Sequence, residues 1–271
     1  MKKSSTLLFL FLIFYAFSYA QDVINTSGAE FTAMGNATVA ISDMWSIQKN
    51  QAGLSLVKKP SIGIAYENKF LIKDLSSRAA VFILPVSKNV FGISFNDFGF
   101  DLYKQQKIGI AYSRAFNEKI SFGFKLNYLS IKIEEYGNST AVSADLGLQY
   151  KLSEKFTLGA HIQNPSAEKF SETTENLIPT AINAGFSYNP SQKVSANVEV
   201  QKDLDQNAIL RAGLSYRPTK IIAIRGGVSG EPFNYYVGFG LLLKDLRIDL
   251  ATTSHPILGY SPQMSLSYVF N

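Results

Sequence analysis

The sequence of 271 residues contains no cysteine, and this absence removes several classes of protein at once. Without thiols the chain cannot form a disulfide framework, use thiol catalysis, hold zinc or an iron–sulfur cluster through cysteine, or carry a lipid on an N-terminal cysteine. Charged residues are also scarce, at 17%, beside 46% hydrophobic residues. So few charges argue against a disordered tail or a charged, solvated scaffold.

The body of the chain also lacks any long apolar run, and its mean hydropathy of +0.04 is far below that of a helical membrane protein. The one such run, residues 7–17, follows Lys2 and Lys3 and ends in small residues before Gln21. This arrangement is typical of a secretory signal peptide, so we expect residues 1–20 to be cleaved. Cleavage removes two lysines and no acid, which lowers the formal net charge from +5 to +3. Such a mildly basic chain predicts no nucleic-acid partner.

From about residue 60 onward, apolar and polar residues alternate with a period of two, the pattern of a strand with two different faces. In residues 120–128 every even position is apolar, while serine, glycine, lysine and asparagine fill the odd ones. Counting such runs predicts about fourteen strands, an even number as in single-chain outer-membrane barrels. The expected strands begin near residues 61, 78, 90, 107, 120, 141, 156, 181, 194, 209, 221, 235, 246 and 263.

The expected connections alternate in length along the chain. Short turns follow the even-numbered strands, at residues 86–89, 117–119, 153–155, 189–193, 217–220 and 244–245. Longer loops follow the odd-numbered strands, and the longest spans residues 165–179. Outer-membrane barrels have this layout, with short periplasmic turns and longer external loops.

We therefore predict an all-β fold: a 14-stranded antiparallel transmembrane β-barrel over residues 58–271, surrounded by outer-membrane lipid, with both termini in the periplasm of a diderm bacterium. The alternative is a secreted β-sandwich, which also alternates. A sandwich exposes one face to water, so that face should carry more charge than the glycine, serine, alanine and asparagine seen here.

Aromatic residues recur at one end of the expected strands. The pattern Gly-x-x-Tyr closes four even-numbered strands and places Tyr112, Tyr150, Tyr188 and Tyr216 on the apolar face. Such a ring is typical of the aromatic girdle at a membrane interface, here the periplasmic one. The chain ends in an alternating run with Tyr268 and Phe270, which looks like the C-terminal signal by which outer-membrane barrels are recognised for assembly.

The opposite parity of each strand is expected to face the barrel lumen. It is rich in glycine, serine and alanine, which leave room for a buried backbone segment. Its polar members could satisfy the hydrogen bonds of such a segment. The expected lumen groups are Lys125, Asp145, His161, Arg211, Arg225, Arg247 and Asp249.

Residues 21–57 do not alternate, and small residues dominate them. Their most distinctive positions are Gly28, Met34, Gly35, Asp43, Trp45, Asn50, Gly53 and Leu54. This pattern resembles the head of the FadL-like outer-membrane barrels and of their relatives, the PorV/PorQ group of type IX secretion. Ala29, Ala37, Val39, Ala40 and Ala52 match as well, whereas Gln51 replaces the usual proline and Met44 a common aspartate. The resemblance implies a plug or hatch over residues 21–57 and a bacterium of the Bacteroidota type.

No catalytic motif accompanies these features. The two histidines, His161 and His255, stand far apart, and the sequence lacks the serine-hydrolase, zinc-protease and phosphate-loop patterns. His161 lies on the lumen parity, where we expect a hydrogen bond rather than a metal ligand. Glycines 226, 227 and 230 are not followed by a helix, so they indicate close backbone approach rather than a nucleotide site. We expect no enzyme, metal or cofactor.

The apolar parity changes within the fifth expected strand. It is even up to Tyr128 and then continues on odd numbers from Leu129. A β-bulge at these two residues would restore the face. We expect a rim irregularity, and the alternative is a kink that opens the wall, which the FadL-like transporters are thought to use for lateral release of ligands.

Three hypotheses describe the function. The preferred one is a non-enzymatic subunit of a protein export or assembly complex, similar to type IX secretion, that contacts other outer-membrane proteins. The alternative is a FadL-like transporter for hydrophobic small molecules, which needs an apolar pocket in the outer loops and a path past the plug. A passive pore would require the plug to be absent. Apolar residues expected in the loops are Phe70, Leu71, Phe98, Phe100, Leu102, Phe233, Ile257 and Leu258.

Overall fold

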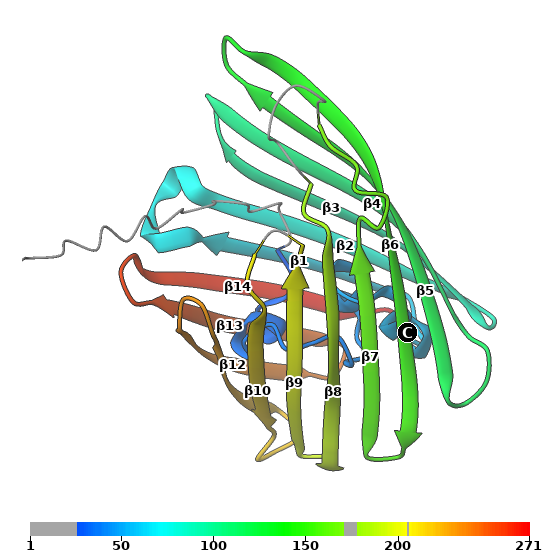
Figure 1. The fold of residues 1–271 in the computed structure, drawn as a ribbon. Coiled ribbons are helices and arrows are strands. Elements are labelled where there is room, and N and C mark those ends of the chain that lie inside the picture. The colour runs from blue at the N-terminus through cyan, green and yellow to red at the C-terminus, as the bar shows by residue number, and fades with distance from the viewer. Residues whose placement is uncertain (1–25, 171–177, 205) are drawn as a thin grey trace, which may run out of the picture.

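The computed structural model describes residues 26–170, 178–204 and 206–271. The expected signal peptide, the first residues of the expected plug and part of the longest expected loop lie outside these ranges. Within them, fourteen strands follow one another around a closed barrel, each antiparallel to its neighbours, and β14 pairs with β1 (Figure 1). The predicted all-β, 14-stranded antiparallel barrel is confirmed.

The strands vary from eight to seventeen residues, and the longest lie in the first half of the barrel. Their bounds are β1 Ser61–Asn68, β2 Ser76–Val86, β3 Asn89–Phe100, β4 Tyr103–Ala115, β5 Ile120–Ile133, β6 Gly137–Ser153, β7 Phe156–Gln163, β8 Ala181–Ser191, β9 Val194–Asp203, β10 Ile209–Tyr216, β11 Ile222–Ser229, β12 Asn234–Leu243, β13 Leu246–His255 and β14 Gly259–Val269.

The period of two in the sequence becomes the two faces of this wall. In β4, Ile110 points outward and is 62% exposed, between buried Gly109 and Ala111. Large apolar side chains exposed around the outside of a barrel are unfavourable in water and favourable against lipid. Closure also leaves no unpaired strand edge, which a membrane-spanning sheet requires.

Three connections are shorter than the sequence suggests. β4 begins at Tyr103 rather than near 107, β6 at Gly137 rather than near 141, and β14 at Gly259 rather than near 263. The expectation of a longer loop after every odd strand is therefore wrong for the β3–β4, β5–β6 and β13–β14 connections. The first residues of β4 and β6 are polar on both faces, and Pro262 interrupts the alternation at the start of β14, so the local pattern is lost although the backbone pairing continues.

The two ends of the barrel differ in their connections. We call the end with the six connections 87–88, 116–119, 154–155, 192–193, 217–221 and 244–245 the turn end. The opposite end, which holds the β1–β2 and β7–β8 connections, is the loop end.

The expected bulge in β5 is wrong. Tyr128 pairs with Ile108 of β4 and with Val142 of β6, and Leu129 continues both registers without a shift. Leu129 therefore points inward and is buried. The apolar parity changes because the lumen face of β5 itself becomes apolar toward the loop end, at Leu129, Ile131 and Ile133. Register shifts occur instead beside the turn end, between Lys151 and Ser153 and between Tyr188 and Ser191.

The N-terminal segment, residues 26–57, lies inside the barrel (Figure 1, blue). It contains α1 Ala29–Ala33 and the 3₁₀-helices η1 Met44–Gln48 and η2 Gln51–Leu56. Two further 3₁₀-helices, η3 Lys69–Leu71 and η4 Lys73–Leu75, lie in the β1–β2 connection. None of the helices in the described ranges is long and apolar enough to cross a membrane.

The main hydrophobic core lies between this segment and the inner face of β1–β4. The segment contributes Phe31, Met34, Met44, Trp45, Ile47 and Leu54, and the strands contribute Ala65, Ala79, Val81, Ile83, Val90 and Ala111. Trp45, Phe31 and Leu54 are completely buried. Each such side chain contributes about 1.5–3 kcal/mol by leaving water, so packing is one source of the segment's attachment to the wall.

Candidate functional site

The inner wall is shaped to the backbone of the N-terminal segment. At Gly213 of β10 an added Cβ would collide with the carbonyl oxygen of Met34, and at Gly227 of β11 with the amide of Gly35. Gly35 itself has φ +66°, and its Cβ position would lie 2.8 Å from the carbonyl oxygen of Val228. Only glycine permits this backbone conformation and this approach at low cost.

Conspicuous residues of the N-terminal pattern also form hydrogen bonds within the segment and to the wall. The indole of Trp45 covers Gly28 and donates a hydrogen bond of 3.0 Å from Nε1 to Ser267 Oγ of β14. The amide of Asn50 donates to the carbonyls of Val39, at 2.6 Å, and Leu148, at 3.1 Å. These side chains therefore join separate turns of the segment to one another and to the wall.

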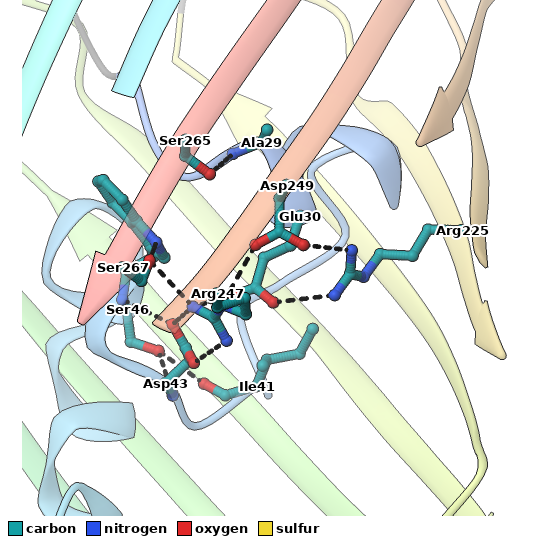
Figure 2. A network of polar contacts seen from close by, with 11 residues as sticks. Ala29, Glu30, Ile41, Asp43, Ser46, Arg225, Arg247, Asp249, Ser265 and Ser267 are labelled. Atoms are coloured by element: carbon teal, nitrogen blue, oxygen red, sulfur yellow. Dashed lines mark hydrogen bonds and ion pairs between the residues drawn. The ribbon is translucent and has the colours of Figure 1, made fainter. Parts of the chain in front are cut away.

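Five charged groups meet on the side of the segment that faces β11 and β13 (Figure 2). We call Glu30, Asp43, Arg225, Arg247 and Asp249 the ionic cluster. Arg225 reaches Asp249 Oδ1 at 2.7 Å and Glu30 Oε2 at 3.3 Å. Arg247 reaches Glu30 Oε1 at 2.7 Å, Asp43 Oδ2 at 3.0 Å and Asp249 Oδ2 at 3.2 Å. Two guanidinium groups thus bridge carboxylates of the segment to the wall.

The ionic cluster holds three carboxyl groups and two guanidinium groups, so one carboxyl in excess. Burial raises the pKa of Glu30 to about 8, and the negative charges of Asp43 and Asp249 act in the same direction against Arg247 and Arg225. Burial also acts to raise the pKa of Asp43, but the charge and hydrogen bonds of Arg247 and the backbone N–H of Trp45 bring it below the ordinary value. A proton on Glu30 makes the cluster neutral.

Asp43 has a second task, because it caps η1. Its carboxylate accepts a hydrogen bond of 3.0 Å from the amide of Trp45, and Ser46 Oγ accepts one of 3.1 Å from the amide of Asp43. This reciprocal pair is a capping box, which starts the helix and orients the carboxylate.

A second anchor lies on β9. Glu199 Oε2 accepts hydrogen bonds from the backbone amides of Thr38 at 2.7 Å and Val39 at 2.8 Å. Arg211 of β10 lies 3.7 Å from the other carboxylate oxygen. Gln149 of β6 donates to the carbonyls of Val39 and Ile41. The stretch without helices is therefore bound to the wall through its backbone amides and carbonyls.

The remaining polar residues predicted for the lumen also point inward. Lys125 Nζ donates to the carbonyl of Ile47 at 3.0 Å. Asp145 accepts a hydrogen bond of 2.8 Å from Asn127. His161 Nδ1 lies 3.4 Å from Asn183 Nδ2. In the described part of the chain no group of three or more histidine or acidic side chains is arranged so that it could hold a metal ion.

The predicted girdle tyrosines lie on the outward face near the turn end. Tyr150, Tyr188 and Tyr216 are 36–46% exposed, and Tyr112 donates a hydrogen bond to Asn89 Oδ1. At the end of the chain, the rings of Tyr268 and Phe270 pack edge to face with centroids 5.1 Å apart. The roles of the four tyrosines as a girdle at a membrane interface, and of the last strand as an assembly signal, stay predictions.

Two site residues were missed by sequence reasoning. Glu30 is the single acid between Asp22 and Asp43, in a stretch of small residues. Glu199 lies on the lumen parity of a strand. A rule that treats every acid on the lumen parity, or alone among small residues, as a partner for a lumen arginine would have found both.

Two cavities flank the segment. The outer cavity, about 490 Å³ at the loop end, includes Phe70 and Phe98 but is lined largely by polar side chains such as His161, Glu199 and Arg211. The inner cavity, about 810 Å³ at the turn end, borders Glu30, Phe31 and Arg247. The segment thus stands between two spaces, and the ionic cluster borders the inner one. Of the apolar residues expected in loops, Phe98 and Phe100 lie in β3 instead.

No protein-family model and no curated protein matches the chain.

Solved structures match over most of the chain at low identity. The toluene transporter TbuX of Ralstonia pickettii has a TM-score of 0.71 and 12% identity, over 90% of this chain and 98% of that one. The toluene transporter TodX of Pseudomonas putida has a TM-score of 0.68 and 12% identity, over 91% and 99%. A FadL homologue of Pseudomonas aeruginosa has a TM-score of 0.64 and 12% identity, over 91% and 99%. The similarity is one of fold.

Proposed function

We propose that this chain is a non-enzymatic outer-membrane channel that admits small hydrophobic molecules, with residues 21–57 as a plug that moves to open it. The observation that carries the proposal is a closed barrel with an inner segment between two cavities, in a fold shared along nine-tenths of the chain with toluene transporters. The short-turn end, where β14 and the chain end, faces the periplasm in this proposal. Thr26, the first described residue, borders the outer cavity, so the expectation that both termini lie on the periplasmic side is supported only for the C-terminus.

The two cavities define the start and the end of the path. A solute enters the outer cavity beside Phe70 and Phe98 and leaves through the inner cavity beside Phe31. Between them it must pass the segment, so passage requires some contacts of the segment with the wall to break. Glu30 and Arg247 lie where the segment meets the inner cavity, and protonation of Glu30 would change their ion pairs at this point.

A disulfide cross-link between the segment and the wall tests this proposal. The chain has no native cysteine, so two introduced cysteines have no other thiol in the chain to pair with. The amide of Ala29 lies 3.0 Å from Ser265 Oγ of β14, so the pair A29C/S265C can tether α1 to the wall. We expect uptake of radiolabelled toluene into proteoliposomes to fall at least tenfold when the disulfide is formed and to recover on reduction.

The control is the pair S55C/S121C, whose native hydroxyl oxygens lie 2.8 Å apart. This pair tethers the segment close to its junction with β1, where little movement is needed, so uptake should stay near the wild-type rate. Equal uptake by the oxidised and reduced A29C/S265C variant would exclude a moving plug. No uptake by the wild-type protein would exclude a toluene channel.

A second candidate function rests on the polarity of the outer cavity. Glu199, Arg211 and His161 line it, and such a lining suits hydrocarbons poorly. A barrel of the PorV/PorQ kind, which acts through contacts with other outer-membrane proteins in an export complex, needs no apolar path. Recovery of the chain with large partners after mild detergent extraction would favour this candidate, and recovery as a lone monomer would count against it.

A further inference from the structure

The outward face of the barrel is apolar along most of its strands, but four charged side chains gather on it at the loop end of β2–β5. They are Arg78 of β2, Asp97 of β3, Lys104 of β4 and Lys132 of β5, which we call the outward patch. Each has the parity of exposed apolar residues on its own strand, such as Phe95 on β3 and Ile108 on β4. The patch therefore points away from the lumen.

Asp97 organises two of the cations. Its carboxylate lies 3.3 Å from Arg78 Nη1 and 3.4 Å from Lys104 Nζ, and it accepts a hydrogen bond of 3.0 Å from Gln106. The side chain of Asp97 is only 10% exposed, whereas those of Arg78 and Lys104 are 64% and 47% exposed. One largely buried carboxylate thus positions two cationic side chains, and both of them remain accessible from outside the barrel.

Lys132 adds a third cation without an acid of its own. It stands directly opposite Lys104 in the β4–β5 pairing, on the same face. Like charges in this position repel one another. Asp101, Glu134 and Glu135 lie in the adjacent turns, but none of the residues that the structure describes forms an ion pair with Lys132. Three cations and one carboxylate leave the patch with a net charge of +2.

The wall becomes apolar a short way below the patch. Phe95 lies one outward position closer to the turn end than Asp97, and Ile108 and Tyr128 lie two outward positions closer than Lys104 and Lys132, beyond Gln106 and Ser130. These three apolar side chains are 38%, 45% and 48% exposed. A ligand that covers both zones has an anionic head and apolar chains. Arginine and lysine recognise phosphate by charge-assisted hydrogen bonds, and anionic membrane surfaces attract such clusters.

We propose that the outward patch binds a phosphate group of lipid A in the leaflet at the loop end, with its acyl chains along the wall of β3–β5. Arg78 and Lys104, fixed by Asp97, hold one side of the phosphate, and Lys132 holds the other. The phosphate then lies between Lys104 and Lys132 and removes their repulsion. The inference rests on the proposed function only in placing the loop end in the outer leaflet.

Native mass spectrometry of the full-length protein in mild detergent tests the proposal, with phosphorylated lipid A, the same lipid without its phosphates, and phosphatidylglycerol as probes. We expect phosphorylated lipid A to bind best. Near an anionic surface each removed cation should weaken binding roughly fivefold, so K132Q loses about fivefold and R78Q/K104Q/K132Q on the order of 100-fold. K202Q removes an outward lysine of β9 and should bind as the wild type does.

Lys132 is exposed and has no ion pair in the described structure, so K132Q keeps the test valid if the triple variant does not fold. Equal binding of lipid A with and without phosphates would overturn the proposal, as would equal affinity of K132Q and K202Q, or a preference for phosphatidylglycerol. The oxidised A29C/S265C variant should bind lipid A normally, so a failure of transport and a failure of lipid binding are told apart.

Discussion

At the scale of single residues, the ionic cluster decides how the N-terminal segment is held. Arg225 and Arg247 each contact one carboxylate of the wall and at least one of the segment. Removing one member of a buried ion pair leaves the other uncompensated, which is far more costly than losing an exposed pair. The cluster therefore couples the position of α1 to the charge state of a few groups.

The pKa of Glu30 makes the stability of this arrangement depend on pH. Between its ordinary pKa of 4.5 and its folded-state pKa of about 8, the folded chain holds a proton that the unfolded chain has lost. Raising the pH through this window therefore lowers the free energy of unfolding. We expect the urea midpoint in detergent to fall between about pH 5 and pH 8, and to fall less in E30Q.

The control for this measurement is E118Q, which changes an exposed acid in the β4–β5 turn. Its urea midpoints should follow those of the wild type at every pH. Asp43 acts in the opposite sense, because its lowered pKa contributes stability that is lost as the pH falls through that value. Parallel curves for E30Q and the wild type across the whole window would contradict the role given to Glu30.

At the scale of elements, glycines in β10 and β11 fit the wall to the segment. The two neighbouring glycines of β11 make this clear. A Cβ at Gly227 would collide with the backbone of Met34 and Gly35, whereas a Cβ at Gly226 would come no closer than 3.8 Å to its nearest neighbour, the carbonyl oxygen of Tyr236. A side chain at position 227 would therefore collide with the segment, whereas a side chain at position 226 would not meet it.

This difference predicts unequal effects of two alanine substitutions. G227A should destabilise the fold by about 1–3 kcal/mol, the usual cost of overpacking, or displace the segment. G226A should change stability by less than about 0.5 kcal/mol. Limited proteolysis and thermal unfolding measure both outcomes, and equal behaviour of the two variants would argue against a tightly seated segment.

The elements also show where sequence reasoning reached its limit. Alternation located most strands within two residues, because a half-buried strand carries its signal in consecutive residues. It failed at the start of β4 and β6, where both faces are polar, at the start of β14, where Pro262 interrupts the pattern, and at Leu129, where the lumen face of β5 becomes apolar. In each case the pairing of neighbouring strands, not the local pattern, set the structure.

At the scale of the whole molecule, fourteen strands form a closed wall, and the N-terminal segment packs inside it. The N-terminal segment supplies half of the main core, and the cavities at the two ends stay separate spaces of about 490 and 810 Å³. Fourteen-stranded walls enclose more room than their own side chains fill, so in the proposed function it is the segment that closes this lumen.

Deleting residues 21–57 should therefore open the barrel. We expect the conductance in planar bilayers to rise at least severalfold over that of the full-length chain, and the thermal stability to fall because the core loses Trp45 and Phe31. Unchanged conductance of a folded deletion variant would mean that the wall collapses inward and closes the lumen by itself. Far-ultraviolet circular dichroism checks that the deletion variant keeps its strands.

The sequence by itself determined the two faces of most strands and the lumen parity of Lys125, Asp145 and Arg247, because these depend on a local period of two; the strand count favoured a barrel, and the pairing of β1 with β14 closes it. Only the tertiary structure decided which of these groups meet. Glu30 and Arg225 are 195 residues apart, and Asp43 and Arg247 are 204 apart. Contacts over such distances depend on the strand order, the register and the path of the segment through the lumen, and no local pattern records them.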